Sequence, residues 1–158
     1  DCHPGQIIYI SHGEAEKEIS KFIKNKYGDP ASYESAKTQL RDILLKKLKL
    51  AKRQLLKPGK ILITTLGSKG SIIETKEARY KIPIAKPDNC SDPTGAGDAY
   101  RAGFLAGYLR GLSLPISGRM GSLAATYSVE KSGTQTHKYS LSSFKKRYKS
   151  NYNDELRY

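Results

Sequence analysis

A chain of 158 residues with a formal net charge of +13 at pH 7 corresponds to one domain, long enough to bury roughly 70% of the surface that its unfolded form exposes. The excess of lysine and arginine allows nucleic acid, an acidic membrane surface or an anionic small molecule as a partner. No apolar run approaches the ~20 residues that a membrane-spanning helix needs, so the composition excludes such a helix within these residues.

The first residue is Asp1 and the only methionine is Met120, so we expect the chain to be a fragment or a processed product of a longer protein. The two cysteines, Cys2 and Cys90, form no CxxC or metal-binding pattern. So few cysteines are typical of a reducing compartment, and we expect a cytoplasmic protein.

Two helices are predicted early in the chain, after a turn over residues 1–6. The first begins near His12 and runs to about Lys24. The second spans residues 35–57, where apolar side chains recur at intervals of three and four and basic side chains occupy the other face. Such a helix can bind nucleic acid, a membrane or a groove in a partner protein, but no base-stacking aromatic residues interleave with these charges. We expect it to be solvated and to cover a sheet.

A strand, a glycine-rich turn and a hairpin are predicted next. Residues 60–65 are rich in β-branched side chains, which is typical of a strand buried on both faces in an α/β sheet. This strand leads directly into residues 66–70, where glycines allow a tight turn and the close approach of a ligand to the backbone. Residues 71–75 and 80–84 then predict a pair of hairpin strands around a polar turn.

The run from Asp92 to Asp98, Asp-Pro-Thr-Gly-Ala-Gly-Asp, predicts an anion-binding turn at the start of a helix over residues 99–110. Gly95 and Gly97 free the backbone to turn and to present amides, and Asp98 occupies the expected N-cap position. Backbone amides at a helix start suit phosphate, and a carboxylate beside them suits a base for a hydroxyl nucleophile. An ordinary helix start is the alternative. A dinucleotide-binding fingerprint is excluded because its third glycine would fall at Tyr100.

Two further helices are expected in the last third of the chain. Gly111 ends the preceding helix, and Pro115 begins one that runs to about Lys131. The last helix lies within residues 139–158, around Phe144 and Tyr148. Strands that lead directly into helices predict the α/β class.

The Asp92–Asp98 run, continued by Ala-Tyr-Arg-Ala-Gly-Phe-Leu-Ala-Gly over residues 99–107, resembles the C-terminal signature of the ribokinase-like (PfkB) carbohydrate and nucleoside kinases. The Asp-Pro-Thr variant is similar to that of the adenosine-kinase-like branch. The resemblance spans nearly the whole chain but corresponds to the rear half of a family member. It implies that residues 1–158 are the ATP-binding, C-terminal portion of a ribokinase-like α/β/α sandwich, without the front half that carries most substrate contacts and the lid.

The resemblance also implies roles for individual residues. Asp98 would be the general base, and the amides of Gly95, Ala96 and Gly97 would form the anion hole. ATP would be held by Thr65, Gly67 and Gly70, and by Gly121 in the adenine pocket, although Gly121 could equally be a packing glycine.

Metal handling is the part of the resemblance from which the sequence departs. The family has an Asn-x-x-Glu element that helps to hold Mg²⁺ and phosphate. Glu34 falls on its glutamate position, but Ala31 replaces the asparagine, and a solvated residue at a helix start is an equal alternative. In family members that use a monovalent cation such as K⁺, Asp92 and carbonyls of the loop over residues 131–137 would contribute to its site.

The sequence therefore predicts ATP- and Mg²⁺-dependent phosphoryl transfer to a hydroxyl of an adenosine-like nucleoside or of a sugar. One alternative is a non-catalytic ATP-binding half that requires a separate N-terminal half or a second copy of the chain as its partner. A basic nucleic-acid-binding module is the less favoured alternative, and a membrane partner is not expected.

Overall fold

The computed structural model describes residues 7–11, 55–133 and 135–157. The helices predicted over residues 12–24 and 35–57 lie outside this part of the chain, apart from residues 55–57, and so does Glu34. The described elements are β1 (Ile7–Ser11), β2 (Ile61–Thr65), a 3₁₀ turn η2 (Gly67–Lys69), β3 (Ser71–Glu74), β4 (Arg79–Ile82), α3 (Ala96–Tyr108), α4 (Leu114–Val129) and α5 (Leu141–Tyr152).

The strands form one mixed sheet in the order β1-β2-β3-β4. β1 and β2 are parallel, with Ile7 opposite Ile61, whereas β2, β3 and β4 are joined by antiparallel pairs. The sequence analysis assigned no strand to residues 7–11, although the run Ile-Ile-Tyr-Ile is rich in strand-forming side chains. A parallel strand pair joined by a long connection fits the predicted α/β class.

The strand and hairpin predicted over residues 60–84 are confirmed with small shifts at their ends. Arg79 belongs to β4, because it pairs with Glu74 across the hairpin and the two side chains form a 3.4 Å ion pair. The turn is closed by Thr75, whose backbone N–H donates to the Ala78 carbonyl at 2.8 Å. β4 ends at Ile82 instead of Ile84 because Pro83 has no N–H to donate to a neighbouring strand.

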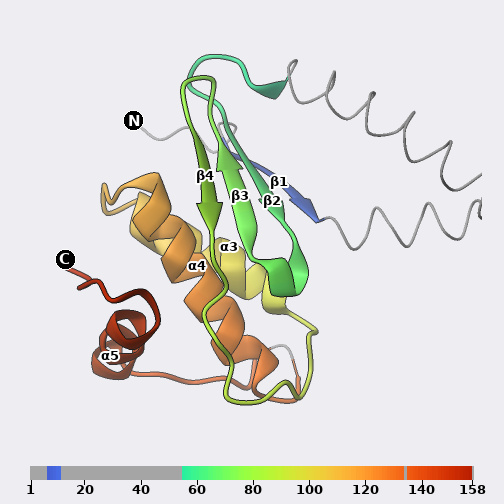
Figure 1. Ribbon diagram of the computed structural model, residues 1–158. Helices are drawn as coiled ribbons and strands as arrows, with labels where there is room; N and C mark the ends of the chain where they lie inside the picture. The colour runs from blue at the N-terminus through green and yellow to red at the C-terminus, as the bar shows by residue number, and fades with distance from the viewer. Residues whose placement is uncertain (1–6, 12–54, 134, 158) are drawn as a thin grey trace, which may run out of the picture.

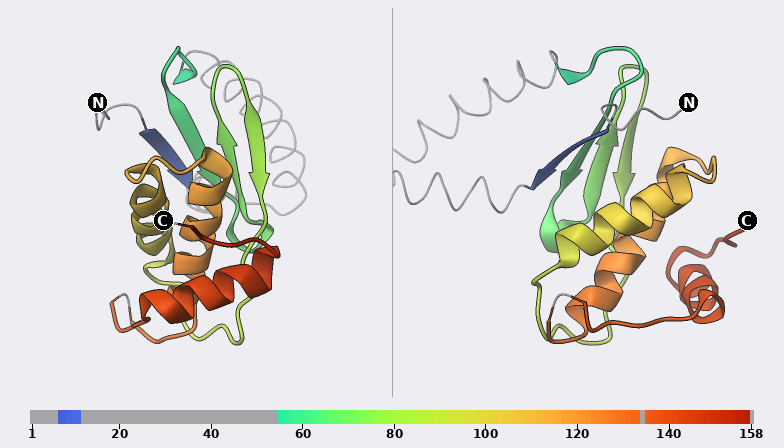
Figure 2. Two further views of the ribbon diagram at one scale, coloured as in Figure 1. Left: turned by 90° about the vertical axis from the view of Figure 1, so that its left-hand side faces the viewer. Right: turned by 180° about the vertical axis from the view of Figure 1, so that it is seen from behind.

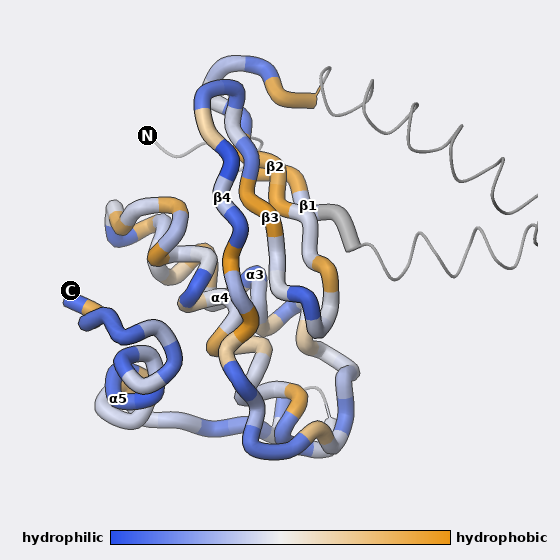
Figure 3. The backbone as a smooth tube through the Cα atoms, in the orientation of Figure 1, coloured by the Kyte–Doolittle hydropathy of each residue, from blue (hydrophilic) through white to orange (hydrophobic). Residues whose placement is uncertain are grey.

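Helices α3 and α4 cover one face of the sheet (Figure 1). Alternate residues of the strands point toward them, as the period of two requires. These side chains and the apolar side of α3 form the first hydrophobic cluster, made of Ile61, Ile63, Ile73, Ile82, Tyr100 and Phe104. Figure 3 shows the matching concentration of hydrophobic residues along β1, β2 and β3.

Glycines let α3 and α4 approach closely. A Cβ atom at Gly103 would lie 2.7 Å from the Met120 carbonyl oxygen, and one at Gly107 would lie 3.0 Å from the Cα of Ser117. The small residues of α3 thus serve the contact with α4.

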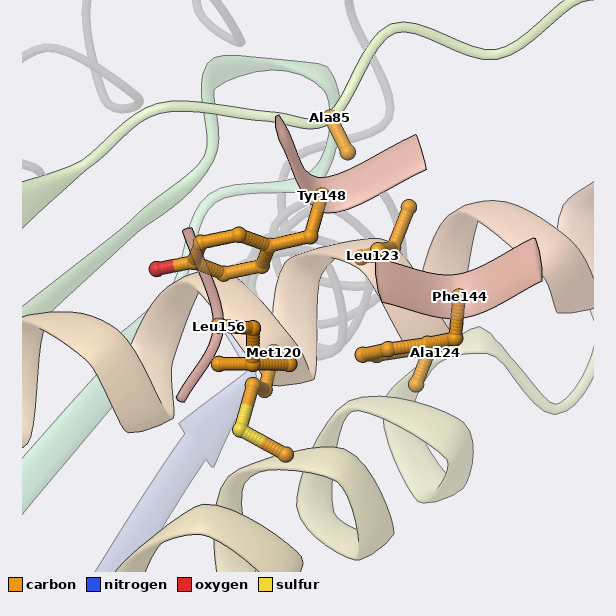
Figure 4. Packing of buried hydrophobic residues seen from close by; sticks show 7 residues of the cluster. All are labelled: Ala85, Met120, Leu123, Ala124, Phe144, Tyr148 and Leu156. Carbon is orange, nitrogen blue, oxygen red and sulfur yellow. The ribbon is translucent and has the colours of Figure 1, made fainter. Parts of the chain in front are cut away.

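A second hydrophobic cluster joins α5 to α4 and consists of Ala85, Met120, Leu123, Ala124, Phe144, Tyr148 and Leu156. Figure 4 shows Phe144 and Tyr148 of α5 lying against Met120 and Leu123 of α4. The α5 helix starts in a capping box in which Ser140 and Ser143 bond each other's backbone amides. This bears out the predicted last helix around Phe144 and Tyr148. Among the described residues, no helix combines the length and apolar character needed to cross a bilayer.

Candidate functional site

Three loops meet at one end of the structure, where β2 ends, α3 begins and α4 ends (Figures 1 and 2). They comprise residues 66–70, 92–95 and 129–133, and we call this region the loop end. In α/β sheets, ligands bind beyond the carboxyl ends of the parallel strands. The parallel strands β1 and β2 both end at this edge, with Ser11 opposite Thr65.

The first loop is the glycine turn that follows β2. The Leu66 N–H donates to the Gly70 carbonyl at 2.8 Å and closes the turn. Gly67 and Gly70 both have left-handed backbones, with φ of 59° and 85°. Gly70 is required for a second reason, since a Cβ there would lie 2.1 Å from the Ile82 carbonyl oxygen. A Cβ at Gly67 would meet no atom of the described residues within 4 Å.

The second loop starts α3 earlier than the sequence analysis predicted. The N-cap is Gly95, with a φ of 84°, and the helix begins at Ala96, so Asp98 is the third helical residue and not the N-cap. The left-handed Gly95 already turns the chain into the helix, and its carbonyl accepts the first helical bond from the Ala99 N–H at 2.9 Å. Asp98 therefore lies in the first turn, where the helix dipole favours a negative charge.

The backbone amides at the start of α3 are not all equivalent. The Ala96 N–H donates to the Pro93 carbonyl at 3.2 Å, so it already has an acceptor. For the amides of Gly97 and Asp98, the part of the chain that the structure describes provides no backbone acceptor. A Cβ at Gly97 would meet no atom within 4 Å, and the φ of Gly97 is not positive. Neither backbone geometry nor packing among the described residues therefore explains glycine at position 97.

The Asp98 side chain is 83% exposed and its Oδ1 accepts a hydrogen bond from the Arg101 guanidinium at 3.0 Å. Arg101 also lies over the ring of Tyr9 on β1, 5.5 Å from its centroid. The carboxylate is thus accessible, and an arginine is positioned beside it. The sequence analysis did not single out Arg101, although its i,i+3 spacing from Asp98 was a readable signal.

Asp92 connects the second loop to the third. Its Oδ1 accepts the Thr94 N–H at 2.9 Å, and its Oδ2 accepts the Gly133 N–H at 3.0 Å. The backbone amides of Ser91 and Asp92 both donate to the Val129 carbonyl. Hydrogen bonds from Thr94 and Gly133 hold the pKa of the partly buried Asp92 carboxyl below its usual value. Asp92 is thereby kept ionised and ties the two loops together.

Gly121 lies inside the contact between α3 and α4. A Cβ there would lie 2.8 Å from the Tyr100 carbonyl oxygen and 3.2 Å from two atoms of the Tyr100 ring. Packing therefore accounts for this glycine, while its role in an adenine pocket stays a prediction. Thr65 is half-buried at the end of β2, where it pairs with Ser71 of β3.

No group of three or more His, Cys, Asp or Glu side chains that could hold a metal ion occurs in residues 7–11, 55–133 and 135–157. Glu34 and Asp92 are the two residues predicted to bind a metal ion. Glu34 lies outside the described residues, and Asp92 is surrounded by backbone amides that donate to it.

The sequence model of the pfkB family carbohydrate kinases matches residues 36–140, more than half of the chain. A nucleoside kinase of Methanocaldococcus jannaschii is 50% identical over 76 residues, which cover 48% of this chain and 25% of the relative. A nucleoside kinase of Methanothermobacter thermautotrophicus is 49% identical over 80 residues, covering 51% of this chain and 25% of the relative.

The comparison with solved structures agrees with the sequence comparison. The crystal structure of the M. jannaschii nucleoside kinase, described as an archaeal member of the ribokinase family, superposes with a TM-score of 0.63 at 30% identity. The superposition covers 92% of this chain but 40% of that protein. The chain therefore has a ribokinase-type fold and spans well under half the length of the relatives it matches.

Proposed function

The chain belongs to the pfkB family of carbohydrate kinases, and from this premise we propose that it is the part of a kinase that binds MgATP and transfers its γ-phosphoryl group to a hydroxyl of a nucleoside or a sugar. The observation that carries the proposal is the start of α3. There an accessible carboxylate stands beside first-turn amides, and a glycine that packing does not require leaves space in front of them.

In this proposal the amides of Gly97 and Asp98 receive the charge on the γ-phosphoryl group as it is transferred. Both belong to the first turn of α3, where the helix dipole adds a partial positive charge. Each donor of this kind is typically worth about 10² in rate. The Ala96 amide, which the sequence analysis included in the anion hole with those of Gly95 and Gly97, would instead keep the loop in shape through its bond to Pro93.

Asp98 acts as the general base of the transfer. The substrate oxygen forms its bond to the γ-phosphorus while the bond from that phosphorus to the β–γ bridging oxygen breaks, and ADP leaves. The hydroxyl proton passes to the Asp98 carboxylate, which its high exposure leaves open to a substrate. In the absence of substrate the carboxylate is paired with Arg101, so substrate binding has to displace or share that ion pair.

The nucleotide is held by the glycine turn after β2. We propose that Thr65, Gly67 and Gly70 line the triphosphate and ribose, with the backbone at Gly67 as the closest approach. Mg²⁺ enters as part of the MgATP substrate and neutralises phosphate charge. Because both oxygens of Asp92 accept hydrogen bonds from backbone amides, we assign Asp92 to ordering the loops.

A nucleoside is the favoured acceptor, because the relatives with about half of their matched residues identical are named nucleoside kinases. The acceptor site would come from segments outside this chain, since the chain spans 40% of the superposed kinase. These segments would belong either to a longer form of the same polypeptide or to a separate partner. The mass of the endogenous polypeptide, measured in its own cells, distinguishes the two: a mass near that of the 158 residues requires a partner.

The proposed function is tested by substituting Asp98 with asparagine in the longest natural polypeptide that carries this chain. Asn keeps the size of the side chain but cannot take the proton. We expect phosphoryl transfer from MgATP to fall by about 10² to 10⁴, while the Kd for ATP stays within about twofold. Turnover at the wild-type rate would refute Asp98 as the base, and failure of the wild type to bind ATP would refute the proposed function as a whole.

A further inference from the structure

A buried pair of hydroxyl groups joins the glycine turn after β2 to the helix that starts the proposed phosphate site. The Ser71 Oγ and the Tyr100 hydroxyl lie 2.7 Å apart, a distance typical of a strong O–H···O hydrogen bond. We propose that Tyr100 is a positioning residue, whose bond to Ser71 fixes the nucleotide-binding turn over residues 66–70 relative to the amides and carboxylate at the start of α3. This inference rests on the proposed function for its effect on ATP.

The bond joins residues that are adjacent in sequence to the two parts of the proposed site. Ser71 directly follows Gly70, which closes the turn, and it is held in the sheet between Thr65 and Ile82. Tyr100 follows Asp98 by two positions in the first turns of α3. A shift of either element along the other would therefore break this bond.

The Tyr100 ring is held in place from its other side. Its carbonyl oxygen and ring approach Gly121 of α4 so closely that a Cβ there would lie 2.8 to 3.2 Å from them. The ring thus has α4 on one side and the sheet on the other. With the ring seated between these two surfaces, the hydroxyl is directed to one partner, Ser71 of β3.

The hydroxyl is not needed to fill the core. Phe104, which is one helical turn further along α3, belongs to the same apolar cluster without a polar atom. Ser71 and Tyr100 are only 1% and 5% exposed, so each hydroxyl would lose its hydration without a partner. Burial raises the pKa of Tyr100 to about 12. A buried polar pair of this kind favours one arrangement of its elements over slightly shifted ones.

The test uses the longest natural polypeptide that carries this chain, with Tyr100→Phe, Ser71→Ala and the double variant, since each removes one or both hydroxyls and little else. Tyr148→Phe is the matched control, because Tyr148 is a fully buried tyrosine of α5 whose hydroxyl interacts with Arg119 and Asp154, at the opposite end of α4 from the loop end. Two quantities are measured for every variant: the Kd for MgATP, and amide hydrogen exchange of the ligand-free protein in residues 66–70 and in residues 99–102, whose amides are hydrogen-bonded in the glycine turn and in α3.

We expect each single variant to weaken ATP binding by about 3- to 10-fold, the range that the net value of one hydrogen bond implies. Exchange should rise by a similar factor in both segments, and the double variant should be no worse than the single ones, because both remove the same bond. Tyr148→Phe should leave both readouts unchanged even if it lowers the Tm.

The possible failures can be told apart. If Tyr100→Phe and Ser71→Ala lower the Tm but leave exchange in both segments and the Kd for ATP at wild-type values, the pair is only structural and the inference is wrong. The wild type could fail to bind ATP while exchange still rises in both segments of the variants. The proposed function is then wrong, but the Ser71–Tyr100 bond does fix the two segments relative to each other.

Discussion

Glycines occur in two opposite environments along α3 and the elements around it. At Gly103 in the middle of the helix, a Cβ would lie 2.7 Å from backbone oxygen and 2.9 Å from backbone carbon of α4. At Gly97 in the first turn, a Cβ would meet no atom within 4 Å in the part of the chain that the structure describes, although the backbone is helical. The first glycine is explained by packing. Gly97 lowers the stability of its own helix, and no packing contact among the described residues explains why a glycine is there. A glycine of this kind is expected where space must be kept free for a ligand.

The largest change in stability is expected at Gly103, where a Cβ has no room. Gly103→Ala places a Cβ against the main chain of Met120 and Gly121, which can give way only by moving α4. We expect a loss of about 2 to 3 kcal/mol in the free energy of unfolding, despite the better helix propensity of alanine. Urea unfolding followed by circular dichroism measures it.

Gly118→Ala is the matched control for that prediction. The atoms nearest to its Cβ are Cδ1 of Ile73 and Cγ1 and Cδ1 of Ile82, which are side-chain atoms and can move without a shift of the main chain. We expect it to cost about 1 kcal/mol or less. Equal losses for the two variants would contradict the distinction between backbone and side-chain neighbours.

A second large effect concerns how α5 is held beside this core. Arg147 of α5 pairs with Glu130 at the end of α4, the two side chains being only 16% and 10% exposed, and its guanidinium lies 4.8 Å from the Tyr127 ring centroid. Arg147→Met leaves the Glu130 charge poorly solvated, and we expect a loss of about 2 kcal/mol in unfolding free energy. Adding Glu130→Gln should recover part of this loss; no recovery would mean that the methylene packing of Arg147 matters more than its charge.

The same pair predicts a pH dependence of stability. Hydrogen bonding from Arg147 holds the pKa of Glu130 below its ordinary value of 4.5. The pair's contribution is therefore complete above about pH 4.5 and is lost as the pH falls through the lower pKa of the folded state. Acid titration of unfolding should show a smaller loss of stability below pH 4.5 in the Arg147→Met variant than in the wild type, and an unchanged loss would contradict this source.

The smallest change in stability is expected at Gly97, where a substitution should stabilise the protein. Gly97→Ala should raise the free energy of unfolding by about 0.5 to 1 kcal/mol, since alanine favours the helix and its Cβ meets no neighbour among the described residues. The same Cβ would occupy the space proposed for phosphate, and we expect the Kd for MgATP to rise by about tenfold or more. A stabilised variant with unchanged ATP affinity would refute the proposed use of that space.

Much of the described fold could be predicted because its elements carry local signals. The β-branched run after Pro58–Gly59, Pro115 at a helix start and the spacing of Phe144 and Tyr148 each mark an element that the structure contains. β1 was missed, since its short apolar run has no alternation with polar residues. The start of α3 was misplaced because an aspartate suits both the N-cap and the first turn, and only the left-handed backbone of Gly95 decides between them.

The sequence by itself determined the class of the fold, the family and the glycine-rich turns, because these depend on the period of hydrophobic residues and on a contiguous run over residues 92–98. Only the tertiary structure decided which groups of the site meet. It placed Arg101 over Tyr9 of β1, tied Asp92 to Gly133, and joined Tyr100 to Ser71. The last two contacts link residues 41 and 29 positions apart. No local pattern specifies such pairs, since they form only when α3 and α4 pack against the sheet and bring its loops together.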